Sequence, residues 1–89
     1  MVKLQADDGT IFELLDYTTH PTELLEQKIY NVGATHIAFE VDDVEEAKKN
    51  LEKKGVTFFS NPILSSEGIA KVCFCLDPNN IRIELVELV

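Results

Sequence analysis

The residues best suited to chemistry are a histidine and two glutamates that lie within apolar, strand-like segments. His36 interrupts the stretch "THIAFEVDD", and Glu13 and Glu84 stand in the similar contexts "FELL" and "IELV". A histidine among apolar residues commonly packs and forms a hydrogen bond, but the neutral imidazole is also a frequent metal ligand. An isolated buried carboxylate is costly, so a buried Glu13 or Glu84 needs a partner. For Glu84 the simplest partner is Arg82 on the same strand face or a residue of a neighbouring strand. For Glu13 the simplest interpretation is an exposed strand glutamate.

Four further residues have reactive side chains but weaker support for a functional role. His20 lies in a connector before a proline, and Glu40 ends the strand whose face it shares with His36. Cys73 and Cys75 are two residues apart in a predicted strand, where they point the same way and are poorly placed to bridge each other. We expect both cysteines to be buried thiols in a reducing cytosol.

The histidine belongs to a predicted strand, residues 35–41, in which side chains alternate between two faces. One face carries His36, Ala38 and Glu40, and the other carries Ile37, Phe39 and Val41. The second face is apolar and is therefore expected to pack against the rest of the domain.

The segment that follows, "DDVEEAKKNLEKKG", predicts a helix. Asp43 is a good N-cap, and Glu46 stands three residues later as the reciprocal half of a capping box. Val44, Ala47 and Leu51 share one helical face. The helix is expected to end at Gly55, which can adopt the left-handed conformation.

The remaining C-terminal sequence predicts three strands. We expect strands at 56–60, 69–76 and 81–89, with a loop at 61–68 and a turn at "DPNN". In the closing strand Ile81, Ile83 and Leu85 face one side, and Arg82, Glu84 and Val86 face the other. The predicted order is strand, helix, strand, strand, strand.

Residues 2–17 predict a β-hairpin with a turn at "DDG" and a second arm from 10 to 17, followed by a connector at 18–34. This second arm echoes the closing strand, because "TIFELLDY" and "IRIELVEL" align with Glu13 on Glu84. Each follows an acidic turn. The hairpin therefore reads as the end of a unit whose second copy is complete.

A βαβββ module that begins "HIAFEVDDVEEA" and ends "DPNNIRIELVE" resembles the vicinal oxygen chelate superfamily, which includes glyoxalases, bleomycin-resistance proteins and extradiol dioxygenases. The resemblance implies an α+β fold with a complete module at 31–89. Residues 1–30 then correspond to the terminal hairpin of a truncated first module plus a connector. Because two modules pair around a metal-containing cleft in this family, the resemblance also implies completion as a homodimer, with or without a domain swap.

Transferred by position, the resemblance implies that His36, Glu84 and Glu13 are metal ligands, with Glu84 and Glu13 also catalytic. The fourth family ligand comes from a first strand that precedes the start of this sequence. Imidazole and carboxylate donors suit Zn, Ni, Mn or Fe. One departure is Asn79-Asn80, where the family commonly has an acidic residue and glycine, but Asn can also adopt the left-handed turn conformation.

The implied function is that of a glyoxalase-like, metal-dependent lyase or isomerase of the lactoylglutathione lyase type. The metal would polarise a carbonyl of a small oxygenated substrate and stabilise an enediolate, while a carboxylate carries the proton. Three alternatives remain open at this point: a metal-free small-molecule-binding module of the bleomycin-resistance type, an extradiol-dioxygenase-like enzyme, or a truncated relative that keeps only the fold.

Composition limits the partners. The 89 residues carry 8 basic against 16 acidic side chains, a net charge of −8, which disfavours nucleic-acid binding. The sequence has no apolar run long enough to span a membrane and no apolar signal core at its N-terminus, so we expect a cytoplasmic protein. A domain of this size buries only about 60% of its unfolded surface, which favours a partner subunit.

Overall fold

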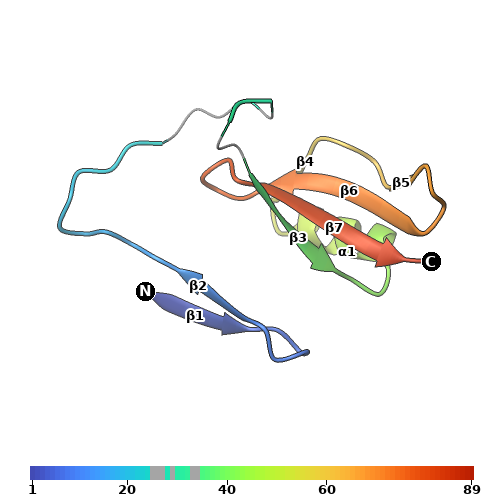
Figure 1. The fold of residues 1–89 in the computed structure, drawn as a ribbon, viewed down its shortest axis with the longest axis horizontal. Coiled ribbons are helices and arrows are strands. Elements are labelled where there is room, and N and C mark those ends of the chain that lie inside the picture. Colours follow the sequence, from blue (N-terminus) through green and yellow to red (C-terminus); the bar gives the residue numbers. More distant parts are fainter. Residues whose placement is uncertain (25–27, 29, 33–34) are drawn as a thin grey trace.

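The computed structural model describes residues 1–24, 28, 30–32 and 35–89. A two-stranded hairpin stands beside a mixed sheet that is backed by one helix (Figure 1). The elements in chain order are β1 (Val2–Gln5), β2 (Ile11–Leu14), β3 (His36–Glu40), α1 (Val44–Lys53), β4 (Thr57–Phe58), β5 (Ile63–Leu64), β6 (Ala70–Leu76) and β7 (Arg82–Leu88). The predicted connector at 18–34 lies partly outside the described residues.

The second sheet has the strand order β3-β7-β6-β4, with β5 also pairing with β6. β3 runs parallel to β7, and β6 runs antiparallel to its three partners. The predicted α+β class and the order of strand, helix, strand, strand, strand are confirmed. The structure has one strand that was not predicted, the two-residue β5, which lies within the stretch that the sequence predicted as a loop.

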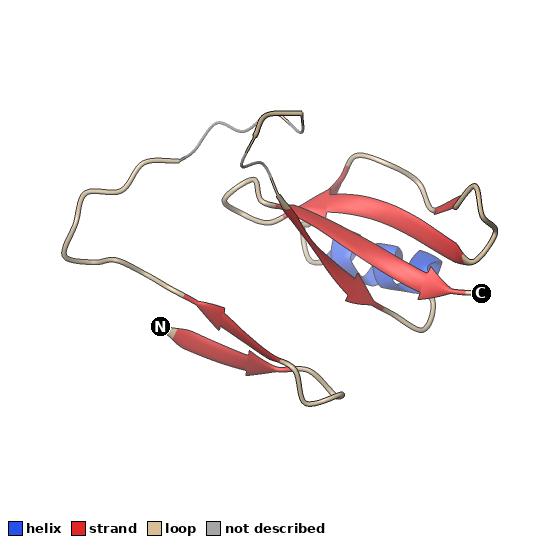
Figure 2. Cartoon of the chain, viewed as in Figure 1, coloured by secondary structure: helices blue, strands red, loops and turns tan. Residues whose placement is uncertain are grey.

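The helix covers one face of the sheet, and the view in Figure 2 looks onto the opposite, open face. Val44, Cys73 and Leu85 form the fully buried centre, with Ala47 and Leu51 of α1 packed against it. The helical face predicted from spacing is therefore the one that packs. Within the described chain, no helix has the length and apolar character needed to cross a membrane.

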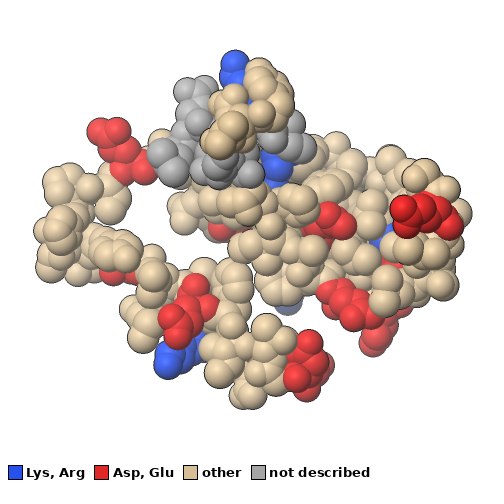
Figure 3. Space-filling model, in the orientation of Figure 1, with Lys and Arg blue, Asp and Glu red and all other residues tan. Residues whose placement is uncertain are grey.

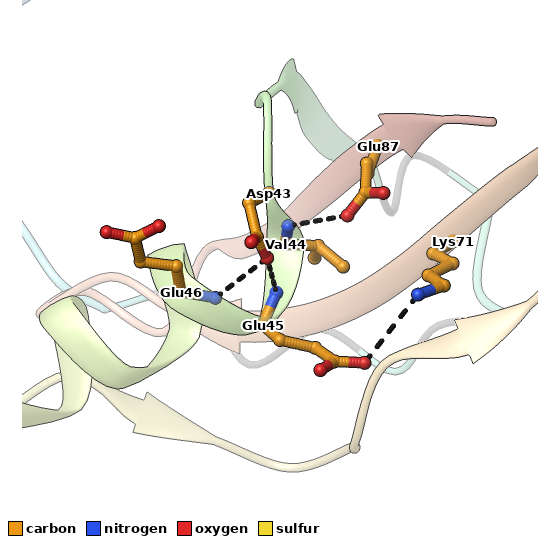
Figure 4. A network of polar contacts seen from close by, with 6 residues as sticks. All are labelled: Asp43, Val44, Glu45, Glu46, Lys71 and Glu87. Atoms are coloured by element: carbon orange, nitrogen blue, oxygen red, sulfur yellow. Dashed lines mark hydrogen bonds and ion pairs between the residues drawn. The ribbon is translucent and has the colours of Figure 1, made fainter.

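The N-terminus of α1 is held by two carboxylates, of which the sequence predicted one (Figure 4). Asp43 accepts hydrogen bonds from the backbone N–H groups of Glu45 and Glu46, each at 3.1 Å. The Val44 N–H donates to Glu87 Oε1 of β7 at 2.9 Å. The predicted return bond from the Glu46 side chain is not among the hydrogen bonds of the described residues. The second carboxylate comes instead from the closing strand.

Both predicted left-handed turn positions in the module are confirmed. Gly55 has φ 91° just after α1, and Asn80 has φ 64° in the turn before β7. Asp77 Oδ1 stabilises that turn by accepting from the N–H groups of Asn79 and Ile81, both at 2.8 Å. An asparagine thus supplies the left-handed conformation that leads the chain into β7.

The hairpin is shorter than predicted, since its second arm is ordered as a strand only at Ile11–Leu14. Its turn is as expected: Gly9 has φ 91°, and the Thr10 N–H donates to Asp8 Oδ1 at 2.9 Å. The backbone N–H of Thr10, aided by its side chain, lowers the pKa of the Asp8 carboxyl. In the single chain β2 is largely uncovered, and Ile11 and Leu14 are exposed.

Cys73 and Cys75 are buried free thiols on the helix-facing side of β6, as predicted. Burial raises the pKa of both thiols. The neighbouring Cys75 adds to the shift at Cys73, and Asp77 adds to the shift at Cys75. Their chemistry is therefore suppressed, and they serve the core.

Candidate functional site

The open face of the sheet brings His36 and Glu84 together. β3 and β7 are paired with Ala38 opposite Glu84, so His36 lies one diagonal step from the glutamate on the same face. His36 Nε2 lies 3.1 Å from Glu84 Oε1. The two side chains are 47% and 20% exposed, which leaves the pair accessible to a ligand. Two of the three predicted ligand residues therefore meet.

Two phenylalanines form an aromatic wall beside this pair. Phe74 of β6 lies opposite Glu84 in the register and meets the His36 ring edge to face, with centroids 5.9 Å apart. Phe59 stacks on Phe74 at 6.0 Å. Two hydrogen bonds join β6 to the residues just after β4, because the Phe59 N–H donates to the Phe74 carbonyl and the Phe74 N–H donates to Ser60 Oγ. These hydrogen bonds fix the positions of the two rings relative to each other and to the sheet.

Arg82 completes the open face. It lies opposite His36 in the β3–β7 register, and its guanidinium carbon is 5.1 Å from the centre of the Phe59 ring. Of the two partners that the sequence suggested for Glu84, Arg82 on the same strand is wrong, whereas a partner on a neighbouring strand is found, because His36 lies on β3. Among the described residues, Glu84 pairs with His36 and Arg82 lies on an aromatic ring.

Glu13 is not brought to this pair within the described chain. It lies on the hairpin, where Lys3 Nζ is 3.7 Å from its Oε1. The described residues contain no group of three or more His, Cys, Asp or Glu side chains placed to hold a metal. Of the secondary candidates, His20 Nδ1 contacts Thr19 Oγ1 at 2.9 Å in an exposed loop, and Glu40 is exposed at the end of β3.

His36 and Glu84 are the types of donor that bind a divalent metal, but they are only two of the four ligands that such a site commonly has. An imidazole nitrogen and a carboxylate oxygen on rigid neighbouring strands are ligands of the kind that Zn, Ni, Mn and Fe(II) accept. Nε2 of His36 and Oε1 of Glu84 are near enough to bind one ion together. A complete site needs donors beyond those that this face brings together.

The sequence reasoning did not identify Phe59, Phe74 and Arg82 as site residues. A signal for Phe74 was available, because alternation along 69–76 puts it on the face opposite Cys73 and Cys75. The position of Phe59 depends on how the two-residue strand β4 pairs with β6, which no local pattern predicts.

A concavity lies between the hairpin and the edge of the module, away from this face. It has a volume of about 1030 Å³, and Phe12 of β2 meets Phe39 of β3 across it with ring centroids 6.0 Å apart. Its lining is apolar along both walls and acidic at the turns, and it contains neither His36 nor Glu84. Figure 3 shows acidic side chains scattered over both parts and few basic ones.

Comparison with known proteins identifies a common family. The sequence profile of the Glyoxalase/Bleomycin resistance protein/Dioxygenase superfamily matches residues 4–85. The lactoylglutathione lyase of Schizosaccharomyces pombe is 42% identical over 72 residues, which are 73% of this chain and 23% of that protein. The chain thus spans about a quarter of the length of this curated relative.

Solved structures agree with the fold. SMU.1112c superimposes with a TM-score of 0.68 at 24% identity, over 96% of this chain and 67% of that one. An integron cassette protein of Vibrio cholerae gives 0.55 at 22% identity, over 98% and 75%. A superfamily member from Sphaerobacter thermophilus gives 0.54 at 33% identity, over 57% of this chain and 40% of that one.

Proposed function

Because this chain belongs to the Glyoxalase/Bleomycin resistance protein/Dioxygenase superfamily, we propose that its open sheet face is half of a metal-dependent active site. The activity that this site supports best is a glyoxalase-like lyase or isomerase reaction on a small oxygenated substrate. The single observation that carries the proposal is the contact of 3.1 Å between His36 Nε2 and Glu84 Oε1 on neighbouring strands.

The ligand set we propose is His36 and Glu84 from one copy, joined by Glu13 from a hairpin. Glu13 is exposed, and Lys3 is its only ion-pair partner among the described residues, so it is available to a second copy. β3 is the outer strand of its sheet and β2 pairs only with β1 in the described chain, so both offer unpaired edges. A homodimer in the cytoplasm, where Cys73 and Cys75 stay reduced, fits these features.

A divalent ion held by these residues would act as a Lewis acid on a substrate carbonyl. The carboxylates of Glu84 and Glu13 are the groups suited to take a proton from the substrate carbon and return it. Phe59 and Phe74 line one side of the pair, where they exclude water from the bound substrate.

The test is metal analysis of the purified protein together with its solution mass. We expect a stoichiometric divalent metal in the wild-type protein and its loss in His36→Ala. Glu40→Gln is the matched control, because Glu40 lies on the same strand face but its side chain forms no hydrogen bond or ion pair in the described chain. Metal content that is absent, or equal in all three proteins, would contradict the proposal.

A metal-free binding module is the second candidate. It is favoured by the aromatic wall and by the finding that only two donor side chains meet in the described chain. Ligand binding that persists unchanged in excess chelator would support this function over the enzymatic one.

A further inference from the structure

Arg82 is the only arginine in a chain of net charge −8, and it lies on the open face of the sheet with His36 and Glu84. Three lysines of the described chain pair with glutamates: Lys3 with Glu13, Lys48 with Glu52, and Lys71 with Glu45. No such pair involves Arg82 in the described residues, although Glu84 is two positions away on the same strand face.

The surroundings of Arg82 explain how it stays available. Glu84 is engaged by His36, so its carboxylate is directed to the imidazole. The guanidinium instead lies over the Phe59 ring, at 5.1 Å from the ring centre. A guanidinium that rests on an aromatic ring keeps N–H donors at its edge, in the fork geometry that matches a carboxylate.

We propose that Arg82 binds the carboxylate of the substrate, and that the substrate class is therefore a small organic anion with a carbonyl or hydroxyl next to its carboxylate. This deepens the proposed function and rests on it. The β3–β7 register allows one substrate to contact both Arg82 and His36, because the two residues lie directly opposite each other on neighbouring strands. Neighbouring strands are only about 4.8 Å apart, so one small molecule can contact both side chains.

The experiment compares the binding of an anion with that of its neutral analogue to the 89-residue chain. Benzoylformate carries a carboxylate beside a ketone, and its methyl ester lacks the charge but keeps the ketone and ring. Dissociation constants are measured by calorimetry for wild type, Arg82→Gln, Arg82→Lys and Lys71→Gln. Lys71→Gln is the matched control, because it removes the same charge from β6 on the opposite, helix-facing side of the sheet.

We expect wild type to bind the anion more tightly than the ester. Arg82→Gln should weaken anion binding by about tenfold or more and leave ester binding unchanged, because a charge-assisted hydrogen bond is lost. Arg82→Lys should be intermediate, since lysine keeps the charge but not the fork. The anion-to-ester ratio is the readout, because a general folding defect would weaken both ligands alike.

Four outcomes would overturn the role of Arg82: no binding of the anion to wild type, equal binding of anion and ester, equal losses for both ligands in Arg82→Gln, or the same loss in Lys71→Gln. Repeating the titrations in excess chelator and with added Zn²⁺ separates this proposal from the proposed function. If the protein binds no metal and still prefers the anion over the ester in excess chelator, the role of Arg82 stands and the metal-dependent enzyme is ruled out. If the protein binds metal but does not prefer the anion over the ester, the metal site stands and the role of Arg82 is ruled out.

Discussion

β2 and β7 have nearly the same local sequence but different surroundings. "IFELLD" at 11–16 and "RIELVE" at 82–87 align glutamate with glutamate and leucine with leucine. In the described chain β2 pairs with β1 alone, whereas β7 lies between β3 and β6 and contacts α1. As a result Leu14 is 49% exposed, and its counterpart Leu85 is 4% exposed.

The two glutamates show what this difference means for function. Glu84 meets an imidazole because β3 is paired beside it, and Glu13 meets only the Lys3 ammonium of its own hairpin. A similar local sequence therefore does not define a ligand, because the neighbouring strand determines which partner the glutamate meets. Mutations at matched positions of the two strands test this contrast directly.

The largest expected effect is on stability. Leu85→Ala removes a side chain from the buried centre that contains Val44 and Cys73, and we expect a loss of about 2–5 kcal/mol in unfolding free energy. Leu14→Ala, at a site exposed in the single chain, should change it by no more than about 0.5 kcal/mol at protein concentrations where the chain is monomeric. Urea denaturation followed by circular dichroism measures both. Equal losses would mean that β2 is covered in solution by another copy.

The next effect concerns metal affinity. Glu84→Gln keeps an oxygen for the His36 hydrogen bond but removes the charge, and we expect Zn²⁺ affinity to fall at least about tenfold, or about 1.4 kcal/mol. Glu13→Gln should lower the Zn²⁺ affinity only at protein concentrations where the chain self-associates. Competition titration with a chromophoric chelator, at two protein concentrations, measures this. No effect of Glu13→Gln at either concentration would remove Glu13 from the ligand set.

A smaller effect is expected at the end of the two strands. Glu87 accepts the Val44 N–H at the start of α1, and its counterpart Asp16 is exposed, with no hydrogen bond among the described residues. Glu87→Ala should cost about 1 kcal/mol of unfolding free energy, as loss of a helix cap does, and Asp16→Ala should be neutral. Thermal denaturation of the two variants compares them. A neutral Glu87→Ala would show that Asp43 is a sufficient cap.

The elements that the sequence predicted well depend on local rules. Asp43 and Gly55 bound the helix because capping and left-handed turns need only nearby atoms. Glu46 was assigned a capping role for the same reason, but the second acceptor is Glu87, 43 residues from Val44. A partner from a distant strand competes with local ones, and no local spacing reveals it.

The candidate site could be predicted only in part for a related reason. Alternation gives the face of each residue only within its own strand, and it was the family resemblance that placed His36 and Glu84 together, as the β3–β7 register does. The aromatic wall and the contact of Arg82 with Phe59 depend on how β4, β6 and β7 align, which depends on tertiary packing. The length of β2 was overestimated because its apolar pattern continues past Leu14, where the described chain supplies no pairing strand.

The smallest expected effect tests the ion pair that holds Glu13 on its hairpin. Lys3 and Glu13 face each other across β1 and β2, but their atoms are 3.7 Å apart and both side chains are largely solvent-exposed. Exposed pairs of this kind contribute little, so Lys3→Ala should change the unfolding free energy by no more than about 0.5 kcal/mol. Urea denaturation at low and high salt should give the same small difference. A larger, salt-sensitive loss would mean that Glu13 is committed to the hairpin, and would then weaken its assignment as a ligand for a second copy.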